Sequence, residues 1–390
     1  DKTARISDPF TGETLVEFKG SKGVISRAEF SPDESLVLTA SIDEGYFYPH
    51  LTPAGEPNIT TQGPWYGESV VRVWDAITGE QKVQLDAHTA QVTDAHFSPT
   101  GRWIATSSLD KTAVLWDAAT GELKHILRGH TASIASVVFT PDSRLVATTS
   151  MGLSIDHKFV VREDGSSSMS GTSQTAFESE LVRFWDVETG KYQAGLKNRN
   201  ERALLGNSQV KDSRCKVTFS DDGRFAVTSA GIPENTGVWD LHAFEWIDGL
   251  KGHGHAVFES EFSHDGKMVA TACADHIARI YQLPSCELIT ELIGHDAPVL
   301  GIDFSLDGKQ LLTVSADGSA RLWDVKTGYG LALLEGHTDR VVDGKFHPDN
   351  FHIATASRDH TVKLWESGTL EQMGITFKGH KKRVDRLAFH

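Results

Sequence analysis

Short segments that alternate apolar and polar residues, or are rich in β-branched and small residues, follow one another along almost the whole chain. Four of them in succession are residues 91–97 (QVTDAHF), 102–108 (RWIATSS), 112–117 (TAVLWD) and 121–129 (GELKHILRG). Turn residues (Pro, Gly and Asp) separate these segments. Short strands at intervals of about ten residues, joined by such turns, predict antiparallel meanders. No segment shows the sustained period of an amphipathic helix.

The group of four segments repeats along the chain. An aromatic residue ends the third segment of each group, at Trp74, Trp116, Trp185, Trp239, Tyr281, Trp323 and Trp365. The spacings are 42, 69, 54, 42, 42 and 42, so the period is 42 and two intervals contain extra residues. A single four-stranded meander cannot bury both of its faces. Neighbouring units must therefore stack, which predicts a ring of blades.

Two dipeptides recur with this period. Trp-Asp occurs at 74–75, 116–117, 185–186, 239–240 and 323–324, and Gly-His occurs at 129–130, 252–253, 294–295, 336–337 and 379–380. Over nearly its whole length the chain thereby resembles the WD-repeat β-propeller family, and the regularity of its repeat sequences resembles that of bacterial members. The resemblance implies a scaffold or sensor module without catalysis, often joined to other domains.

Both ends of the chain supply parts of a further unit. Seven units run from about residue 24 to residue 377, residues 1–20 align with residues 110–129, and the segment up to Phe389 matches a first strand. The prediction is an all-β propeller, a single domain over residues 1–390, with eight four-stranded blades closed by pairing of the N- and C-terminal strands. Seven blades are the alternative. Since the chain starts at Asp1, we expect a fragment of a larger protein.

Three units contain a His, a Ser and an Asp, the residue types of a hydrolase triad. These sets recur with the fold period and no Gly-x-Ser-x-Gly elbow accompanies them, which favours a structural role. The resemblance implies buried hydrogen-bonded tetrads that include the third-strand tryptophan. The predicted tetrads are His88, Ser108, Asp110 and Trp116; His295, Ser315, Asp317 and Trp323; and His337, Ser357, Asp359 and Trp365. No metal, cofactor or converging catalytic cluster is expected.

Three insertions, at about 44–68, 151–178 and 197–208, interrupt the period. They fall between second and third strands, or between a fourth strand and the next first strand. Because the chain reverses at every turn of a meander, these two classes of loop lie on the same face of the ring. Loops on a rigid scaffold carry binding residues, so this face is the predicted partner site. The candidate residues are Tyr46, Phe47, Tyr48, His50, Trp65, Tyr66, Arg199, Arg202, Lys381 and Lys382. In the second insertion, the flanks 157–163 and 178–186 are expected to form a protruding hairpin with a mobile Gly/Ser-rich tip at 164–175.

Composition narrows the partner class. A net charge of -15 argues against a general nucleic-acid binder, and no apolar run approaches a membrane span. Three cysteines suit a reducing compartment, so a cytoplasmic location is expected. The leading hypothesis is a non-catalytic propeller that binds a protein, a peptide or other domains of its parent chain. The alternatives are a phosphate or nucleic-acid reader that uses the basic loops, and an enzyme or small-ligand receptor at the central channel.

Overall fold

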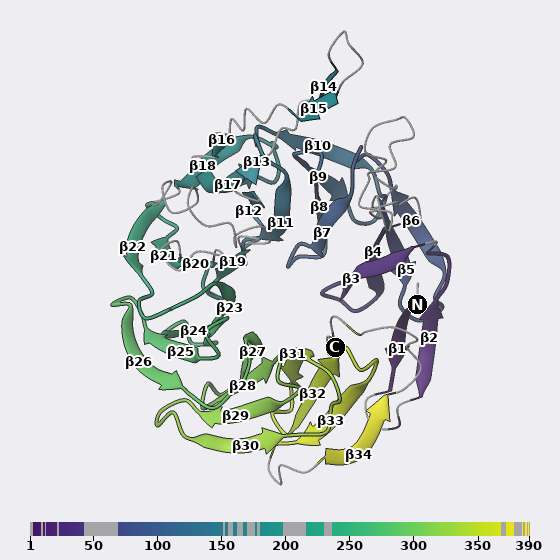
Figure 1. Cartoon of the computed structure of the whole chain (residues 1–390). Coiled ribbons are helices and arrows are strands. Elements are labelled where there is room, and N and C mark those ends of the chain that lie inside the picture. Colours follow the sequence, from purple (N-terminus) through teal and green to yellow (C-terminus); the bar gives the residue numbers. More distant parts are fainter. Residues whose placement is uncertain are drawn as a thin grey trace.

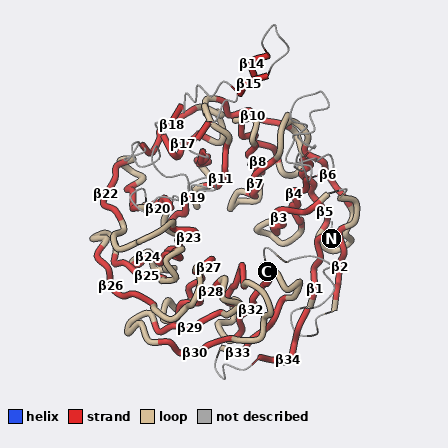
Figure 2. Tube along the Cα trace, in the orientation of Figure 1, coloured by secondary structure: helices blue, strands red, loops and turns tan. Residues whose placement is uncertain are grey.

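The computed structural model describes part of the chain, and every regular element in that part is a β-strand (Figure 2). The described residues are 3–8, 11, 13–21, 23–42, 69–150, 153–154, 159–161, 167–169, 176–177, 180–197, 216–229, 236–367, 372–377, 384, 387 and 389. Within them no helix has the length and apolar character needed to cross a membrane.

Seven sheets of four antiparallel strands follow one another around a ring, and we number them as blades in chain order (Figure 1). Blade one contains β3 (Val24–Phe30), β4 (Leu36–Ile42), β5 (Ser69–Asp75) and β6 (Gln81–Leu85). Blade two contains β7 (Val92–Phe97), β8 (Trp103–Ser108), β9 (Thr112–Asp117) and β10 (Leu123–Arg128). Blade three contains β11 (Ile134–Phe139), β12 (Leu145–Ser150), β17 (Glu180–Asp186) and β18 (Tyr192–Lys197).

The remaining blades have the same order of strands. Blade four contains β19 (Lys216–Phe219), β20 (Phe225–Ser229), β21 (Gly237–Asp240) and β22 (Glu245–Gly249). Blade five contains β23 (Val257–Phe262), β24 (Met268–Cys273), β25 (Ala278–Gln282) and β26 (Glu287–Leu292). Blade six contains β27 (Val299–Phe304), β28 (Gln310–Ser315), β29 (Ala320–Asp324) and β30 (Gly330–Leu334). Blade seven contains β31 (Val341–Phe346), β32 (His352–Ser357), β33 (Val362–Glu366) and β34 (Gln372–Phe377).

The burial of each strand follows its place in the blade. First strands such as β7 and β27 lie nearest the centre of the ring, and fourth strands such as β10 and β30 form its outer rim (Figure 1). Every residue of β8 is buried, because neighbouring blades cover both of its faces. In β10 only Leu127 is buried. The small and β-branched residues of the second strands therefore match a position packed on both sides.

The hydrophobic core is divided among the interfaces between successive blades. Leu38 of blade one belongs to the same buried cluster as Ile104 of blade two. Leu115 of blade two clusters in turn with Ile134 and Trp185 of blade three. No blade buries its own faces alone, so the stability of each depends on its neighbours, as in other repeat architectures.

The second insertion contains two short pairs of strands. β13 (Leu153–Ser154) pairs with β16 (Ala176–Phe177), and β14 (Phe159–Val161) pairs with β15 (Ser167–Met169). β14 and β15 project outward beyond the ring (Figure 1). This hairpin differs from the predicted one, because β14 pairs with β15 from the expected mobile tip, whereas the other predicted flank, β17, pairs with β12 and β18. Backbone pairing across residues 159–169 accounts for the difference.

The N-terminal residues form a two-stranded sheet, β1 (Ala4–Ser7) with β2 (Thr14–Phe18). Phe18 is buried and its ring centre lies 5.8 Å from that of Trp74, so this sheet packs on blade one. A cavity of about 270 Å³ separates it from blade seven, and Leu387 and Phe389 also line this cavity. Among the described residues we see seven four-stranded sheets and one two-stranded sheet. The predicted eighth four-stranded blade and the predicted pairing of the chain ends are not observed there.

Candidate partner-binding face

Three blades contain a complete chain of side-chain hydrogen bonds from an aspartate to a tryptophan. In blade two, His88 Nδ1 lies 3.0 Å from Asp110 Oδ2, and His88 Nε2 lies 2.8 Å from Thr106 Oγ1. Trp116 Nε1 donates to the same Thr106 oxygen at 3.0 Å. The corresponding bonds join His295, Asp317, Thr313 and Trp323 in blade six, and His337, Asp359, Thr355 and Trp365 in blade seven. These networks satisfy polar groups that the packed blades would otherwise bury unpaired.

The residue that supplies the hydroxyl in each network differs from the sequence prediction. Ser108, Ser315 and Ser357 were expected to join the histidine to the tryptophan, but the threonine two residues earlier does so. Ser108 Oγ instead donates to the carbonyl of Ala90 at 3.1 Å and accepts from the amide of Asp110 at 3.1 Å. Ser315 and Ser357 make equivalent backbone bonds. The serine lies at the strand end, where loop backbone takes up its hydrogen bonds, whereas the imidazole reaches further into the sheet.

The ionisation of these networks suits a structural role. Burial favours the protonated form of Asp317, but hydrogen bonds from Ser319 and His295 outweigh it and lower the pKa of Asp317 to about 2. Burial lowers the pKa of His295 from its usual value. At neutral pH an anionic carboxylate therefore faces a neutral imidazole. The imidazole bonds Thr313 and not Ser315, so Ser315 is not placed against His295 as the serine of a hydrolase triad would be.

Among the described residues, other blades show only part of the network. In blade three His130 bonds Thr148 at 2.6 Å, and Trp185 Nε1 donates to that threonine at 2.8 Å. Blades one and four keep the tryptophan-to-threonine bond, from Trp74 to Thr39 at 2.8 Å and from Trp239 to Thr228 at 3.1 Å. The contact between the third and second strands is therefore more widespread than the contact to the turn aspartate.

The complete networks show which loops share a face of the ring. His88 belongs to the loop between β6 and β7, and Asp110 belongs to the turn between β8 and β9. Their 3.0 Å contact places these two classes of loop side by side. The strand ends at Ile42 and Ser69, at Ser150 and Glu180, and at Lys197 and Lys216 belong to the same two classes. The chain therefore leaves and re-enters the ring on one face at all three insertions.

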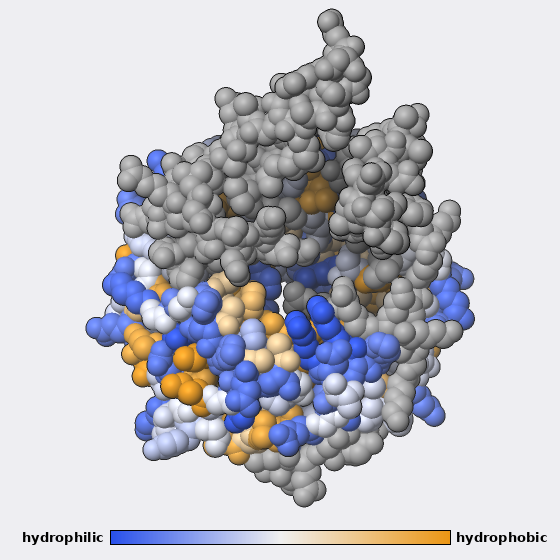
Figure 3. Space-filling model, viewed as in Figure 1, coloured by the Kyte–Doolittle hydropathy of each residue, from blue (hydrophilic) through white to orange (hydrophobic). Residues whose placement is uncertain are grey.

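The predicted binding residues themselves lie outside the described part of the chain. They are Tyr46, Phe47, Tyr48, His50, Trp65, Tyr66, Arg199, Arg202, Lys381 and Lys382. On the described part of the face seen in Figure 3, hydrophobic residues are scattered among hydrophilic ones. The described residues with large exposed apolar side chains include Ile77, Leu306, Tyr329 and Phe351, which occupy turns of the other two classes.

The innermost strands carry ionisable clusters that the sequence analysis missed. Arg27, Glu29, Asp94 and His96 meet where β3 lies beside β7. His96 Nδ1 lies 2.7 Å from Glu29 Oε2, and its Nε2 lies 3.4 Å from Asp94 Oδ2. Burial would lower the pKa of His96, but the carboxylates of Asp94 and Glu29 outweigh it and raise the pKa to about 9. The two carboxylates thus favour the cationic form of His96, against the Arg27 guanidinium 2.6 Å from its Nε2.

A second cluster links blades five to seven. Lys345 Nζ lies 2.5 Å from Asp303 Oδ1, and the other Asp303 oxygen accepts the Phe346 amide at 2.7 Å. Burial raises the pKa of the nearby Glu261 carboxyl well above its usual range. The sequence signal was available: Glu29, His96, Glu261, Asp303 and Lys345 all immediately precede the phenylalanine that ends a first strand.

Carboxylates of this inner ring also bind the next blade directly. Glu259 Oε2 accepts the Ile302 amide at 3.1 Å, and Asp343 Oδ2 accepts the Leu387 amide at 3.0 Å. In both pairs the acceptor and the donor are about one repeat apart in sequence. The Asp343 bond places Leu387 beside β31, where a further first strand is expected to begin its pairing.

Comparison with known proteins gives the same repeat. A family model described as "WD domain, G-beta repeat" matches residues 79–117, 121–159, 245–282, 286–324 and 328–366. The rat (Rattus norvegicus) protein coronin-7 is 31% identical over 109 residues, which are 27% of this chain and 11% of that protein. The human (Homo sapiens) WD repeat and SOCS box-containing protein 1 is 29% identical over 110 residues, 28% of this chain and 24% of that protein.

A solved structure shares the overall architecture. The crystal structure of the computationally designed Ika8 protein matches with a TM-score of 0.70 and 20% identity, over 96% of this chain and 93% of that one. At this identity the likeness concerns the fold alone. Both curated relatives above are mammalian, so the expected likeness to bacterial repeats is not borne out.

Proposed function

From the premise that this chain belongs to the WD-repeat β-propeller family, we propose that it is a non-catalytic scaffold that binds a protein or peptide on the face with the insertions. Members of this family typically mediate protein interactions. The observation that carries the choice of face is the contact between His88 and Asp110, because it brings both loop classes that contain insertions to one side.

The composition of the insertions supports this choice. The first contains six aromatic or histidine side chains, Tyr46, Phe47, Tyr48, His50, Trp65 and Tyr66, and aromatic residues are enriched among those that dominate binding energy. The rigid ring would hold such loops at fixed separations, which lowers the entropy lost when a partner is bound. Cys273 and Cys286 are buried free thiols, which suits the reducing cytoplasm that we propose as its location.

A deletion tests the proposal with little risk to the fold. Removing residues 44–68 joins Asp43 to Ser69 and leaves six residues from Asp43 to Trp74, the spacing found from Asp110 to Trp116 in blade two. The matched control is the double substitution L306S/F351S, which removes two apolar side chains that are 57% and 67% exposed on the turns of the opposite face.

Affinity capture with the tagged chain, followed by quantitative mass spectrometry, would compare the two variants. We expect the deletion to abolish capture of a specific protein and L306S/F351S to retain it. Capture that survives the deletion but is lost in L306S/F351S would place the site on the opposite face and contradict the proposal. Capture lost only in R199E/R202E would move the site to the basic third insertion.

A further inference from the structure

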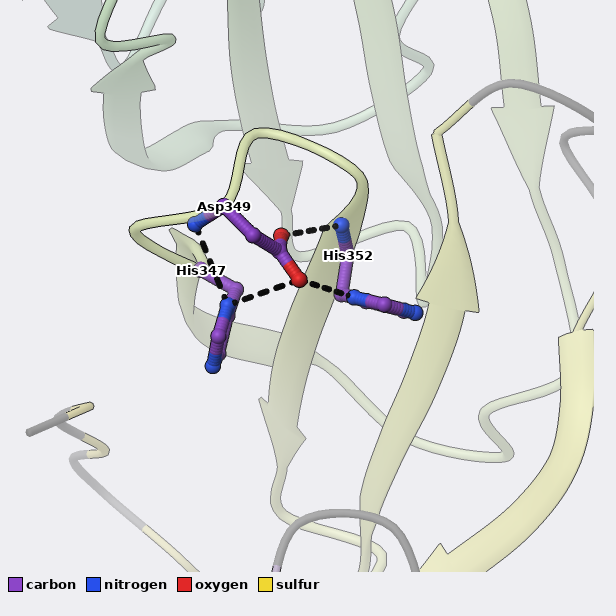
Figure 4. Close-up of side chains that lie close together, drawn as sticks. All are labelled: His347, Asp349 and His352. Atoms are coloured by element: carbon purple, nitrogen blue, oxygen red, sulfur yellow. Dashed lines mark hydrogen bonds and ion pairs between the residues drawn. The ribbon is translucent and has the colours of Figure 1, made fainter.

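The turn between β31 and β32 in blade seven differs chemically from its counterparts. His347 follows the last residue of β31, Asp349 lies in the turn, and His352 begins β32 (Figure 4). His347 Nδ1 lies 3.0 Å from Asp349 Oδ2, and His352 Nδ1 lies 2.5 Å from the same oxygen. All three ligand atoms lie within 4.8 Å of one another. Two imidazole nitrogens and one carboxylate oxygen thus converge on one point at the surface.

The other blades build this turn without either histidine, although here His347 Nδ1 also accepts the Asp349 amide at 3.2 Å. The other six blades have a hydroxyl at the first position, in Ser31, Ser98, Thr140, Ser220, Ser263 and Ser305. In blade six, Ser305 Oγ donates to Asp307 Oδ1 at 2.8 Å and accepts the Gln310 amide at 2.9 Å. The residues aligned with His352 are Leu36, Trp103, Leu145, Phe225, Met268 and Gln310. Both histidines are therefore departures from the repeat, and both point at the same carboxylate.

The two oxygens of Asp349 have separate roles. Oδ1 accepts the amide of Phe351 at 2.7 Å, which is the usual role of the turn aspartate in this chain. It also accepts the His352 amide at 3.1 Å, a bond that a hydroxyl takes up in the other blades. This leaves Oδ2 directed at the two imidazoles (Figure 4). The carboxylate is held in position by backbone donors, as the outer contacts of a metal ligand usually hold it.

The three side chains are also accessible and supported. They are 20%, 30% and 18% exposed for His347, Asp349 and His352. The ring of His347 packs edge-on against Phe389, with ring centres 4.8 Å apart. A site of this kind has three protein ligands on one side and an open side for water or a further ligand.

We propose that His347, Asp349 and His352 form a binding site for a divalent transition metal of the zinc class. Imidazole nitrogen and carboxylate oxygen suit Zn²⁺, with bond lengths of about 2.0 to 2.2 Å. Tetrahedral ligands at such distances are about 3.3 Å apart, so modest rotation of the His352 ring would open its present contact enough to admit the ion. The site lies on a turn of the face opposite the insertions and does not depend on the proposed partner site.

The repeat supplies a matched variant for the test. H347S/H352Q gives the turn the hydroxyl and the strand residue of blade six. The backbone of the two turns already agrees, since Asn350 has a φ of 59° and the aligned Gly308 a φ of 68°. H264A, which removes an exposed histidine from the same turn of blade five, is the control for adventitious binding.

Isothermal titration of the chelator-treated chain with ZnCl₂ measures the site directly, and thermal unfolding of each variant confirms its fold. We expect one ion per chain to bind with micromolar affinity, and H347S/H352Q to weaken this binding at least tenfold while H264A leaves it unchanged. Co²⁺ in place of Zn²⁺ should give visible absorption bands that disappear in H347S/H352Q. Equal zinc binding by the parent chain and H347S/H352Q, or no binding by the parent chain at millimolar zinc, would overturn the proposal.

Discussion

Blades five and six are adjacent, share one fold and are 42 residues apart in sequence, yet their polar cores are connected differently. In blade six, His295 Nδ1 bonds Asp317 at 2.7 Å and Trp323 completes the network. In blade five, His253 Nδ1 bonds the carbonyl of Leu250 at 2.9 Å. Asp275 is 2.8 Å from Arg279 instead, and a tyrosine replaces the tryptophan.

The difference shows which contacts the blade requires. Both histidines bond a second-strand threonine through Nε2, His253 to Thr271 at 2.8 Å and His295 to Thr313 at 2.7 Å. The Tyr281 hydroxyl donates to the carbonyl of Lys251 at 2.6 Å, so the third strand is still joined to the loop that contains His253. The requirement is that buried polar groups find partners and that a large aromatic side chain fills the centre. The aspartate contact is one of several ways to meet it.

The largest effect should come from removing the central aromatic residue of blade six. Trp323 is 3% exposed, and Trp323→Ala would leave a cavity between blades and remove the indole hydrogen bond to Thr313. We expect the free energy of unfolding to fall by about 3 to 5 kcal/mol. Urea denaturation measures it, with Trp323→Tyr as the control that adopts the solution of blade five. A loss below about 1 kcal/mol for the alanine variant would show that this residue is not central.

The threonine bonds should rank next, and they should matter more in blade six. Thr313→Val removes the partner of both His295 Nε2 and Trp323 Nε1. Thr271→Val removes one partner of His253 Nε2 but leaves the Tyr281 hydroxyl 3.3 Å away. Each buried group left unpaired costs about 1 to 3 kcal/mol. Comparing the urea midpoints of the two variants tests the ranking. Equal losses would mean that the indole bond contributes nothing.

The pH dependence of stability should reveal the burial of His253 in blade five. Burial lowers the pKa of His253 to about 4, below its unfolded value of about 6.5, so the unfolded chain binds a proton more readily. Stability should therefore fall as the pH drops from about 6.5 to 4, by about 1 to 3 kcal/mol from this residue. Thermal unfolding across that range should show a shallower slope in His253→Gln. An unchanged slope would assign the effect to other groups.

Exchanging the strand-end residues of the two blades should have the smallest effect. Cys273 occupies the place of Ser315, and its Sγ lies 3.3 Å from the carbonyl of His255. Because blade five already accommodates sulfur there, Ser315→Cys should destabilise by less than about 1 kcal/mol. Thermal unfolding under reducing conditions measures it. A loss comparable to that of Thr313→Val would restore the tetrad role that the sequence assigned to Ser315.

The strands were predictable because period and turn chemistry are local properties. The 42-residue spacing from Tyr281 to Trp323 to Trp365 places these residues in the third strands of three successive blades. The residue that supplies the hydroxyl of the tetrad was harder to predict from the sequence. Thr313 and Ser315 are two residues apart in one strand, so their side chains lie on the same face. Only the reach of the His295 ring determines which hydroxyl it bonds.

The inner cluster needed information that a local pattern does not contain. Lys345 and Asp303 interact because neighbouring first strands are in register, so one repeat in sequence becomes 2.5 Å in space. Reading the residue before each first-strand phenylalanine would have identified it. The aromatic insertion residues are a different case, since Tyr46 and Trp65 lie outside the described chain and remain predictions.

The carboxylate bonds between inner strands give the ring a direction. Glu259 accepts from Ile302, and Asp343 accepts from Leu387, so in both described bonds the acid comes earlier in the chain than the amide by about one repeat. Such head-to-tail contacts are heterologous, and they end only when rotation returns the last unit to the first. A duplicated blade placed between blades five and six would have to present an amide to Glu259 and an acid to Ile302. Duplication of a whole repeat in the gene should therefore preserve these contacts. Duplication of part of a repeat, which supplies the acid without the amide or the amide without the acid, should not.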